Sequence, residues 1–160
     1  MLNSEDPPIT KYSGLSQYFF RLIHTRIIKY ILQINKSKVL DYGCGYKVFD
    51  AMIKRSFAKR KLIVSCLNYD LNSELSDYDS ISNLEYEVFV STHVLQYLST
   101  REIKDLLNGI KTKNKNCTFI FGLSRQNLLS KVLAFLSFNF NAHDATITTY
   151  DKQVEVINKK

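Results

Sequence analysis

The stretch that decides the fold is Lys38–Asp50, which reads KVLDYGCGYKVFD. A short apolar run contains Asp41, two glycines then flank Cys44, and an apolar pattern resumes after Lys47. The run predicts a buried strand, a tight turn and the start of a helix. Such a turn could cradle a phosphate, carry a reactive cysteine, serve only as a turn, or form the floor of another cofactor site.

The first three interpretations of the turn each require particular residues, and the sequence contains only some of them. A dinucleotide loop needs G-x-G-x-x-G and a nucleotide-triphosphate loop needs GK[ST], but Val48 stands at the third glycine position and also follows Lys47. Cys44 could be activated at a helix N-terminus, yet no nearby histidine completes a pair. A purely structural turn stays open, because glycine adopts backbone angles that other residues resist.

The fourth reading includes the acids beside the turn. Asp41 ends the first predicted strand and Asp70 ends the second. An acid at the second position can accept both hydroxyls of a ribose. A ligand that has a ribose, an amino group and a positive charge, but no phosphate, fits this set best. That description matches S-adenosylmethionine.

Strand and helix patterns alternate along the chain. Alternation of this kind predicts an α/β fold, with a mostly parallel sheet and helices on both faces. Ser99 and Glu102 have the spacing of a capping box at a helix start. The predicted strands are 38–42, 61–70, 86–92 and 117–123, and the predicted helices are 15–34, 48–58, a segment after 99, 125–138 and a last one after Thr149.

Composition restricts the class of protein further. The chain has 160 residues, 45% of them hydrophobic, and a net charge of +7. We divide it into an N-terminal segment with an amphipathic helix (1–34) and one α/β domain (35–160). No targeting segment and no apolar run of about 20 residues is visible, so a cytoplasmic protein is expected. The three cysteines lack metal-ligand spacing, so no metal is expected, and Cys66 and Cys117 are interpreted as buried thiols.

Three segments carry a resemblance to a known family. VLDYGCG (39–45) resembles the first motif of the class I S-adenosylmethionine-dependent methyltransferases, and YEVFVSTHVLQYLS (86–99) resembles a second motif around their fourth strand. CTFIFGLSRQNLLSKVL (117–133) is similar to their fifth strand and the segment after it. The resemblance covers about residues 35–155 and implies a Rossmann-like fold with S-adenosylmethionine as cofactor. The Cys-Gly-Tyr-Lys version resembles a GCGxK subgroup common among sugar- and cell-envelope-modifying enzymes.

The resemblance also implies roles for residues around the turn. Gly43 and Gly45 would let the backbone approach the methionine portion of the cofactor. Cys44 would line the turn, and Asp41 would help to hold the amino end. Asp70 would bind the ribose hydroxyls.

Further along the chain, the resemblance implies that Leu71 packs beside the adenine. Asp77 would meet the adenine amino group, with Asp79 as its rival. The remaining implied pocket residues, beneath the methyl group, are Ser91, Thr92 and His93.

No catalytic residue is assigned. Methyl transfer mainly requires alignment of donor and acceptor, and a general base helps only when the acceptor is a hydroxyl. His93 and His143 are weak candidates for such a base, because a packing role for His93 and an exposed loop position for His143 are favoured.

Departures from the family pattern leave a second hypothesis for the function of this chain. Lys47 stands where the family often has glycine, and little between Asp70 and Tyr86 resembles a third strand. The chain ends before the usual antiparallel hairpin, so strand 117–123 would be an uncovered edge that a protein partner or a second copy covers. The leading hypothesis is a methyltransferase; the alternative is a truncated, non-catalytic cofactor-binding or scaffold remnant.

The acceptor is predicted to be a small molecule or a glycan or cell-envelope intermediate. An RNA methyltransferase is a weaker alternative, and nucleic acid is disfavoured because no aromatic residues interleave the basic clusters. The apolar segment 128–140 is interpreted as a buried helix. A lid for a lipid-linked acceptor is the second interpretation, which leaves peripheral membrane contact open.

Overall fold

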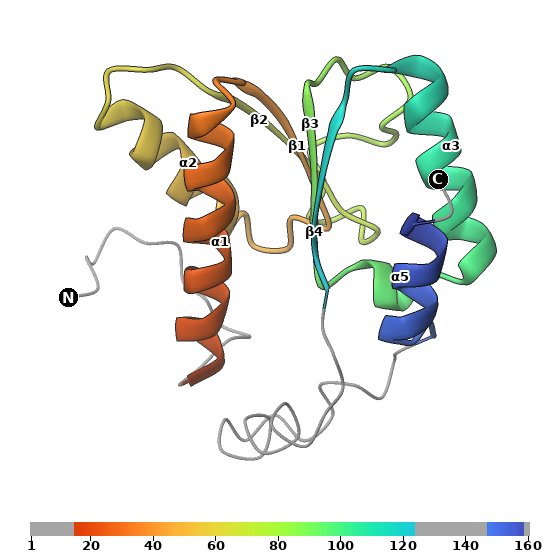
Figure 1. The fold of residues 1–160 in the computed structure, drawn as a ribbon. Helices are drawn as coiled ribbons and strands as arrows, with labels where there is room; N and C mark the ends of the chain where they lie inside the picture. Colours follow the sequence, from red (N-terminus) through yellow and green to blue (C-terminus); the bar gives the residue numbers. More distant parts are fainter. Residues whose placement is uncertain (1–14, 124–146, 159–160) are drawn as a thin grey trace.

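The computed structural model describes residues 15–123 and 147–158 (Figure 1). These residues form one sheet of four strands with helices on both sides. The elements in chain order are α1 (Leu15–Gln33), β1 (Lys38–Tyr42), α2 (Val48–Ala58), β2 (Ser65–Tyr69), β3 (Val88–Thr92), the short 3₁₀ helix η1 (Leu95–Tyr97), α3 (Thr100–Lys113), β4 (Thr118–Gly122) and α5 (Tyr150–Asn158).

The sheet is parallel throughout and has the strand order β2-β1-β3-β4. Val39 in β1 lies opposite Cys66 in β2 and Val88 in β3, which fixes the register of β1 with both of its neighbours. The chain goes from β1 to β2 on one side and then crosses to β3 on the other. The order therefore reverses between β1 and β3, which is where open α/β sheets bind ligands. The predicted α/β architecture is confirmed.

Strand residues alternate between two apolar layers, because successive side chains point to opposite faces of a sheet. Val39 joins the layer under α1 and α2, whereas Leu40 and Tyr42 join the layer under α3 and α5 (Figure 1). The first layer is built around Ile27, Ile28, Ile31, Phe49, Ile53, Phe57, Val88 and Val90. The second is built around Phe89, Leu95, Ile103, Leu107, Ile110 and Val156.

The predicted capping box at the start of α3 is present. The Ser99 side chain accepts a hydrogen bond from the Glu102 N–H, and the Glu102 carboxylate accepts one from the Ser99 N–H at 2.7 Å. These two bonds satisfy donors that a helix start otherwise leaves free. They fix where α3 begins, so its apolar face turns onto the sheet.

The predicted boundaries of β2 differ from the structure. The Lys61 N–H bonds to the Ala58 carbonyl and the Leu62 N–H to the Phe57 carbonyl, which is the Schellman pattern that ends a helix. Lys61 and Leu62 therefore belong to the turn that follows α2, and β2 begins only at Ser65. Residues 71–87 form turns and bends and no strand. The predicted helix at 125–138 and His143 lie outside the described residues.

Candidate functional site

The glycine turn after β1 contacts the end of β2 and the residue Val94, which follows β3. The N–H groups of Gly43 and Cys44 both donate to the Tyr69 carbonyl, at 2.7 and 3.1 Å. Gly43 has φ +84°, and a Cβ there would lie 1.9 Å from a methyl carbon of Val94. Both the backbone angle and the lack of space therefore require glycine at this position.

The second glycine of the turn is held by an acid from the end of β2. The Gly45 N–H donates to Asp70 Oδ2 at 2.8 Å, and the Asn72 N–H donates to Asp70 Oδ1 at 2.9 Å. Asp70 thus connects the glycine turn to the chain that follows β2. Each carboxylate oxygen can accept a further hydrogen bond, so Asp70 can still meet a ligand hydroxyl.

A cavity of about 60 Å³ lies between this turn and α1. It contains the buried Asp41 carboxyl, which is 2% exposed and whose Oδ2 has no hydrogen-bond partner among the described residues. Burial, and then the charges of Asp50 and Asp70, raise the Asp41 pKa to about 7. A cation beside Asp41 would remove this penalty. The lining residues are Phe20, His24, Asp41, Gly43, Cys44, Gly45, Tyr46, Val48, Phe49 and Thr92.

His24 in α1 is a cavity residue that the sequence analysis missed. Its Nε2 lies 3.5 Å from Thr92 Oγ1, and its ring meets Phe49 edge-on at 5.3 Å. Burial, and then the charge of His93, lower the His24 pKa to about 4, so the ring is neutral at pH 7. The helical spacing of Phe20 and His24 places both on one face of α1, which is the available sequence signal. Only the packing of α1 against α2 shows that this face meets the cavity.

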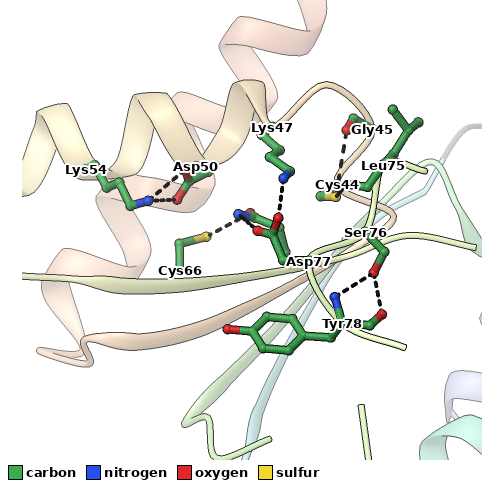
Figure 2. A network of polar contacts seen from close by, with 11 residues as sticks. Cys44, Gly45, Lys47, Asp50, Lys54, Cys66, Leu75, Ser76, Asp77 and Tyr78 are labelled. Atoms are coloured by element: carbon green, nitrogen blue, oxygen red, sulfur yellow. Dashed lines mark hydrogen bonds and ion pairs between the residues drawn. The ribbon is translucent and has the colours of Figure 1, made fainter. Parts of the chain in front are cut away.

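The segment 75–78 lies beside the glycine turn and is tied to it by polar contacts (Figure 2). Lys47 Nζ forms an ion pair with Asp77, and Asn68 Nδ2 donates to Asp77 Oδ2 at 3.0 Å. The bonds from Lys47 and then Asn68 hold the Asp77 pKa below its usual range. The Cys44 thiol lies 3.6 Å from the Leu75 carbonyl. Asp77 therefore contacts the turn from outside the cavity.

Lys47 has an unusual backbone conformation for its side chain. It is the N-cap residue of α2 and has φ +58° and ψ +29°, in the left-handed region that favours glycine. Its side chain reaches Asp77 from this position. The position thus combines a glycine-like backbone with an ion pair that no glycine could make.

The other predicted pocket residues separate into two groups. Thr92 lines the cavity, as does Cys44, whose thiol pKa is raised to about 12, first by burial and then by Asp41. Such a thiol stays protonated and is not a nucleophile. Ser91 is buried but does not line the cavity, and neither does His93. The His93 N–H donates to the Gly122 carbonyl at 2.7 Å, and its ring packs 4.7 Å from that of Phe20.

The two candidate adenine contacts and Leu71 lie at the surface. Leu71, directly after Asp70, is 48% exposed and offers an apolar surface beside the acid. Asp77 and Asp79 are exposed too, and Asp79 has no hydrogen bond or ion pair within residues 15–123 and 147–158. The predicted site residues therefore range from the buried Asp41, through the turn that Asp70 holds, to the exposed Leu71, Asp77 and Asp79.

The described residues offer neither a metal site nor a membrane-spanning helix. They contain no group of three or more His, Cys, Asp or Glu side chains placed to hold a metal ion. None of the described helices is long and apolar enough to cross a membrane.

The parallel sheet, its switch point and the glycine turn define a Rossmann-like fold. A crystal structure of magnesium protoporphyrin IX methyltransferase (ChlM) from Synechocystis PCC 6803 with bound SAH matches it with a TM-score of 0.52 and 12% sequence identity. The match covers 92% of this chain and 77% of that one. No protein-family model and no curated protein matches the sequence. This similarity shows the fold.

Replacing each glycine of the turn with alanine separates crowding from backbone strain. Gly43→Ala should lower the free energy of unfolding by about 3 kcal/mol or more, because the new methyl overlaps Val94. Gly45→Ala should lower it by only about 1 kcal/mol, since nothing lies within 4 Å of its Cβ position and only the positive φ opposes it. Urea unfolding measures both; equal losses would contradict this account of the turn.

Two substitutions at position 47 isolate the strain at Lys47. Lys47→Gly and Lys47→Ala both remove the ion pair to Asp77, so they differ in their tolerance of the left-handed backbone, which favours glycine, and in the entropy of the unfolded chain, which favours alanine by less. The glycine variant should be more stable than the alanine variant by about 1 kcal/mol in urea unfolding. An alanine variant that is as stable as the glycine variant would show that the strain is absent.

Proposed function

We propose that this protein is an S-adenosylmethionine-dependent methyltransferase that acts on a small-molecule or glycan acceptor. The observation that carries the proposal is the Asp41 carboxyl, which is buried at the cavity with one oxygen lacking a partner among the described residues. It lies beside a glycine turn at the switch point of a parallel sheet. Such a group is costly to bury unless a ligand compensates it.

The charges around the turn favour a cationic ligand over a phosphate. Asp50 and Asp70 both raise the pKa of Asp41, so the site already opposes one more negative charge. A pyrophosphate would add such charge, whereas an ammonium or sulfonium group would neutralise it. The one basic side chain at the turn, Lys47, is held by Asp77. S-adenosylmethionine carries both cationic groups and no phosphate.

The dimensions of the site favour partial enclosure of the cofactor. The cavity of about 60 Å³ is smaller than the roughly 300–1,000 Å³ of pockets that enclose a whole ligand. We therefore place the methionine end in the cavity beside Asp41, the ribose at Asp70 and the adenine over Leu71. Asp77 would accept a hydrogen bond from the adenine amino group. Its carboxylate has lone pairs that the bonds from Lys47 and Asn68 do not use. Ser91 and His93 do not line the cavity, so they would support the residues that do and would not contact the methionine end directly.

The proposed chemistry asks more for alignment than for proton transfer. The sulfonium supplies a methyl group that is already activated for in-line displacement. The residues of this chain would bind and orient it: Asp41 holds the amino end, and the turn fixes the distance of approach. His24, with a pKa of about 4, is too weak a base to deprotonate an acceptor at pH 7. His93 remains a weak candidate base, and His143 lies outside the described residues.

The alternative is a non-catalytic scaffold that keeps the fold. In the described sheet, β4 is the last strand in the order, so its outer edge is where a partner would pair. A scaffold of this type need not bind the cofactor. Titration with S-adenosylhomocysteine therefore divides the two hypotheses.

Calorimetric titration with S-adenosylhomocysteine should give saturable binding in the micromolar range or tighter. A 2′-deoxyribose analogue should bind roughly tenfold more weakly, because a hydrogen bond to a charged acid is lost. In Asp70→Asn, the difference between the two ligands should largely disappear, which isolates the ribose contact from any effect on the turn. A folded protein that binds neither ligand would exclude the enzyme. An undiminished difference in the variant would refute the Asp70 assignment.

Asp41→Asn should weaken cofactor binding and raise the free energy of unfolding. The folded pKa of about 7 lies above the unfolded value of 3.8, so wild-type stability falls as the pH rises from about 4 to 7. The variant lacks this loss, so its stability advantage should grow over that window, by up to about 4 kcal/mol, and level off above pH 8.

The opposite effect of His24, whose folded pKa lies below 6.5, is present in both proteins and cancels in the difference. Urea unfolding at several pH values measures the stability difference. Affinity for S-adenosylhomocysteine should fall at least tenfold in the same variant. A difference in stability that does not change with pH would contradict the buried, unpaired carboxyl.

A further inference from the structure

A second surface lies at the other end of the sheet, where α2 leads into β2. The loop 59–63 reads KRKLI and follows the last turn of α2. Ile63 is 89% exposed and Leu62 is 44% exposed, next to three consecutive basic residues. Lys59, Arg60 and Lys61 form no ion pair with any described residue. We call these five residues the basic-aliphatic loop.

The exposure of Ile63 comes from an ordered turn. The Arg60 and Leu62 N–H groups both bond to the Phe57 carbonyl, and the Lys61 N–H bonds to the Ala58 carbonyl. Val64, the next residue, is buried in the layer under α1 and α2. The chain is therefore anchored on both sides of the loop, which holds Ile63 out in solvent. Lys61 has φ +57°, where glycine is favoured, so the turn keeps a basic side chain at the expense of strain.

More basic residues share this end of the molecule. The amino-terminal ends of the strands and the last turn of α3 lie on the same side as the loop (Figure 1). Those positions carry Lys36, Lys38, Lys111, Lys113 and Lys115. Two acids, Glu85 and Glu87, also lie there, just before β3, and Glu85 forms an ion pair with Lys38 at 3.5 Å. The basic residues still outnumber the acids at this end. A basic end attracts an anionic partner by its field.

We propose that the basic-aliphatic loop docks the protein onto an anionic phospholipid surface. Basic side chains would contact the lipid headgroups, and Leu62 and Ile63 would enter the boundary with the acyl chains. Nucleic acid offers the same charge but gains nothing from an exposed isoleucine, and the loop has no aromatic side chain on which a base could stack. A membrane uses both features of the loop. The inference does not depend on the proposed methyl transfer.

The test is co-sedimentation of the full chain with vesicles at low and physiological ionic strength. Binding is expected to vesicles of mixed phosphatidylcholine and phosphatidylglycerol and not to phosphatidylcholine alone. The double variant Lys59→Gln/Lys61→Gln should lower the partition coefficient by roughly twentyfold, since each basic residue near an anionic surface contributes roughly a fivefold factor. Ile63→Ser should lower it several-fold without changing the salt dependence.

Two matched controls separate the loop from general effects. Lys104→Gln/Lys152→Gln removes the same net charge from α3 and α5, on the other face of the sheet, and should change binding by less than about twofold. Ile147→Ser alters an isoleucine that is 65% exposed away from the loop and should leave binding unchanged. Circular dichroism should show the same fold for all four variants, because every altered side chain is exposed.

Each outcome decides the proposal. Loss of binding only in the two loop variants supports it. No binding to anionic vesicles, or equal losses in the loop and control variants, overturns it. If Ile63→Ser has no effect and single-stranded RNA binds with the same dependence on Lys59 and Lys61, the surface is a nucleic-acid site. Affinity for S-adenosylhomocysteine should be unchanged in the loop variants, so failure here is distinguishable from failure of the proposed function.

Discussion

The ends of three neighbouring strands meet at Gly43. Its N–H donates to the carbonyl of Tyr69 at the end of β2, and its missing side chain leaves the space that Val94 fills just after β3. The close approach joins β1 to both neighbours and turns the chain back toward α2. Asp41, two residues earlier, is thereby enclosed between the sheet and the helices. This contact forms one wall of the cavity, and α1 and α2 supply the rest of its lining.

Several groups around the turn are unfavourable for folding. Asp41 has a pKa raised by burial, Lys47 has a left-handed backbone, and His24 has a ring nitrogen with no partner among the described residues. Strain and unsatisfied polar groups of this kind gather at functional sites, where a ligand or the surrounding structure compensates them. By contrast, the capping box of α3 is fully satisfied. The buried polar groups without partners thus include Asp41 and His24 at the cavity, whereas left-handed backbone occurs at both ends of the sheet, at Lys47 and at Lys61.

Local patterns were enough to predict much of the fold and part of the site. The run from Lys38 to Asp50 predicted β1, the turn and α2, because alternation, glycine and helical spacing all act over a few residues. The end of β2 was predicted, but its start was not, since the Schellman bonds that end α2 involve backbone groups common to every residue. The ion pair between Lys47 and Asp77 was not predicted either, because its partners are 30 residues apart in sequence and local patterns do not extend that far.

The sequence by itself determined the alternation of strands and helices, a glycine turn after the first strand and the acids at the strand ends, since each depends on residue type and near neighbours. Only the tertiary structure decided that Asp41 is buried while Asp70 holds Gly45, and that His24 faces the same cavity. Burial and pKa depend on which helices cover the sheet. That coverage arises from contacts between residues far apart in the chain, and no local pattern encodes it.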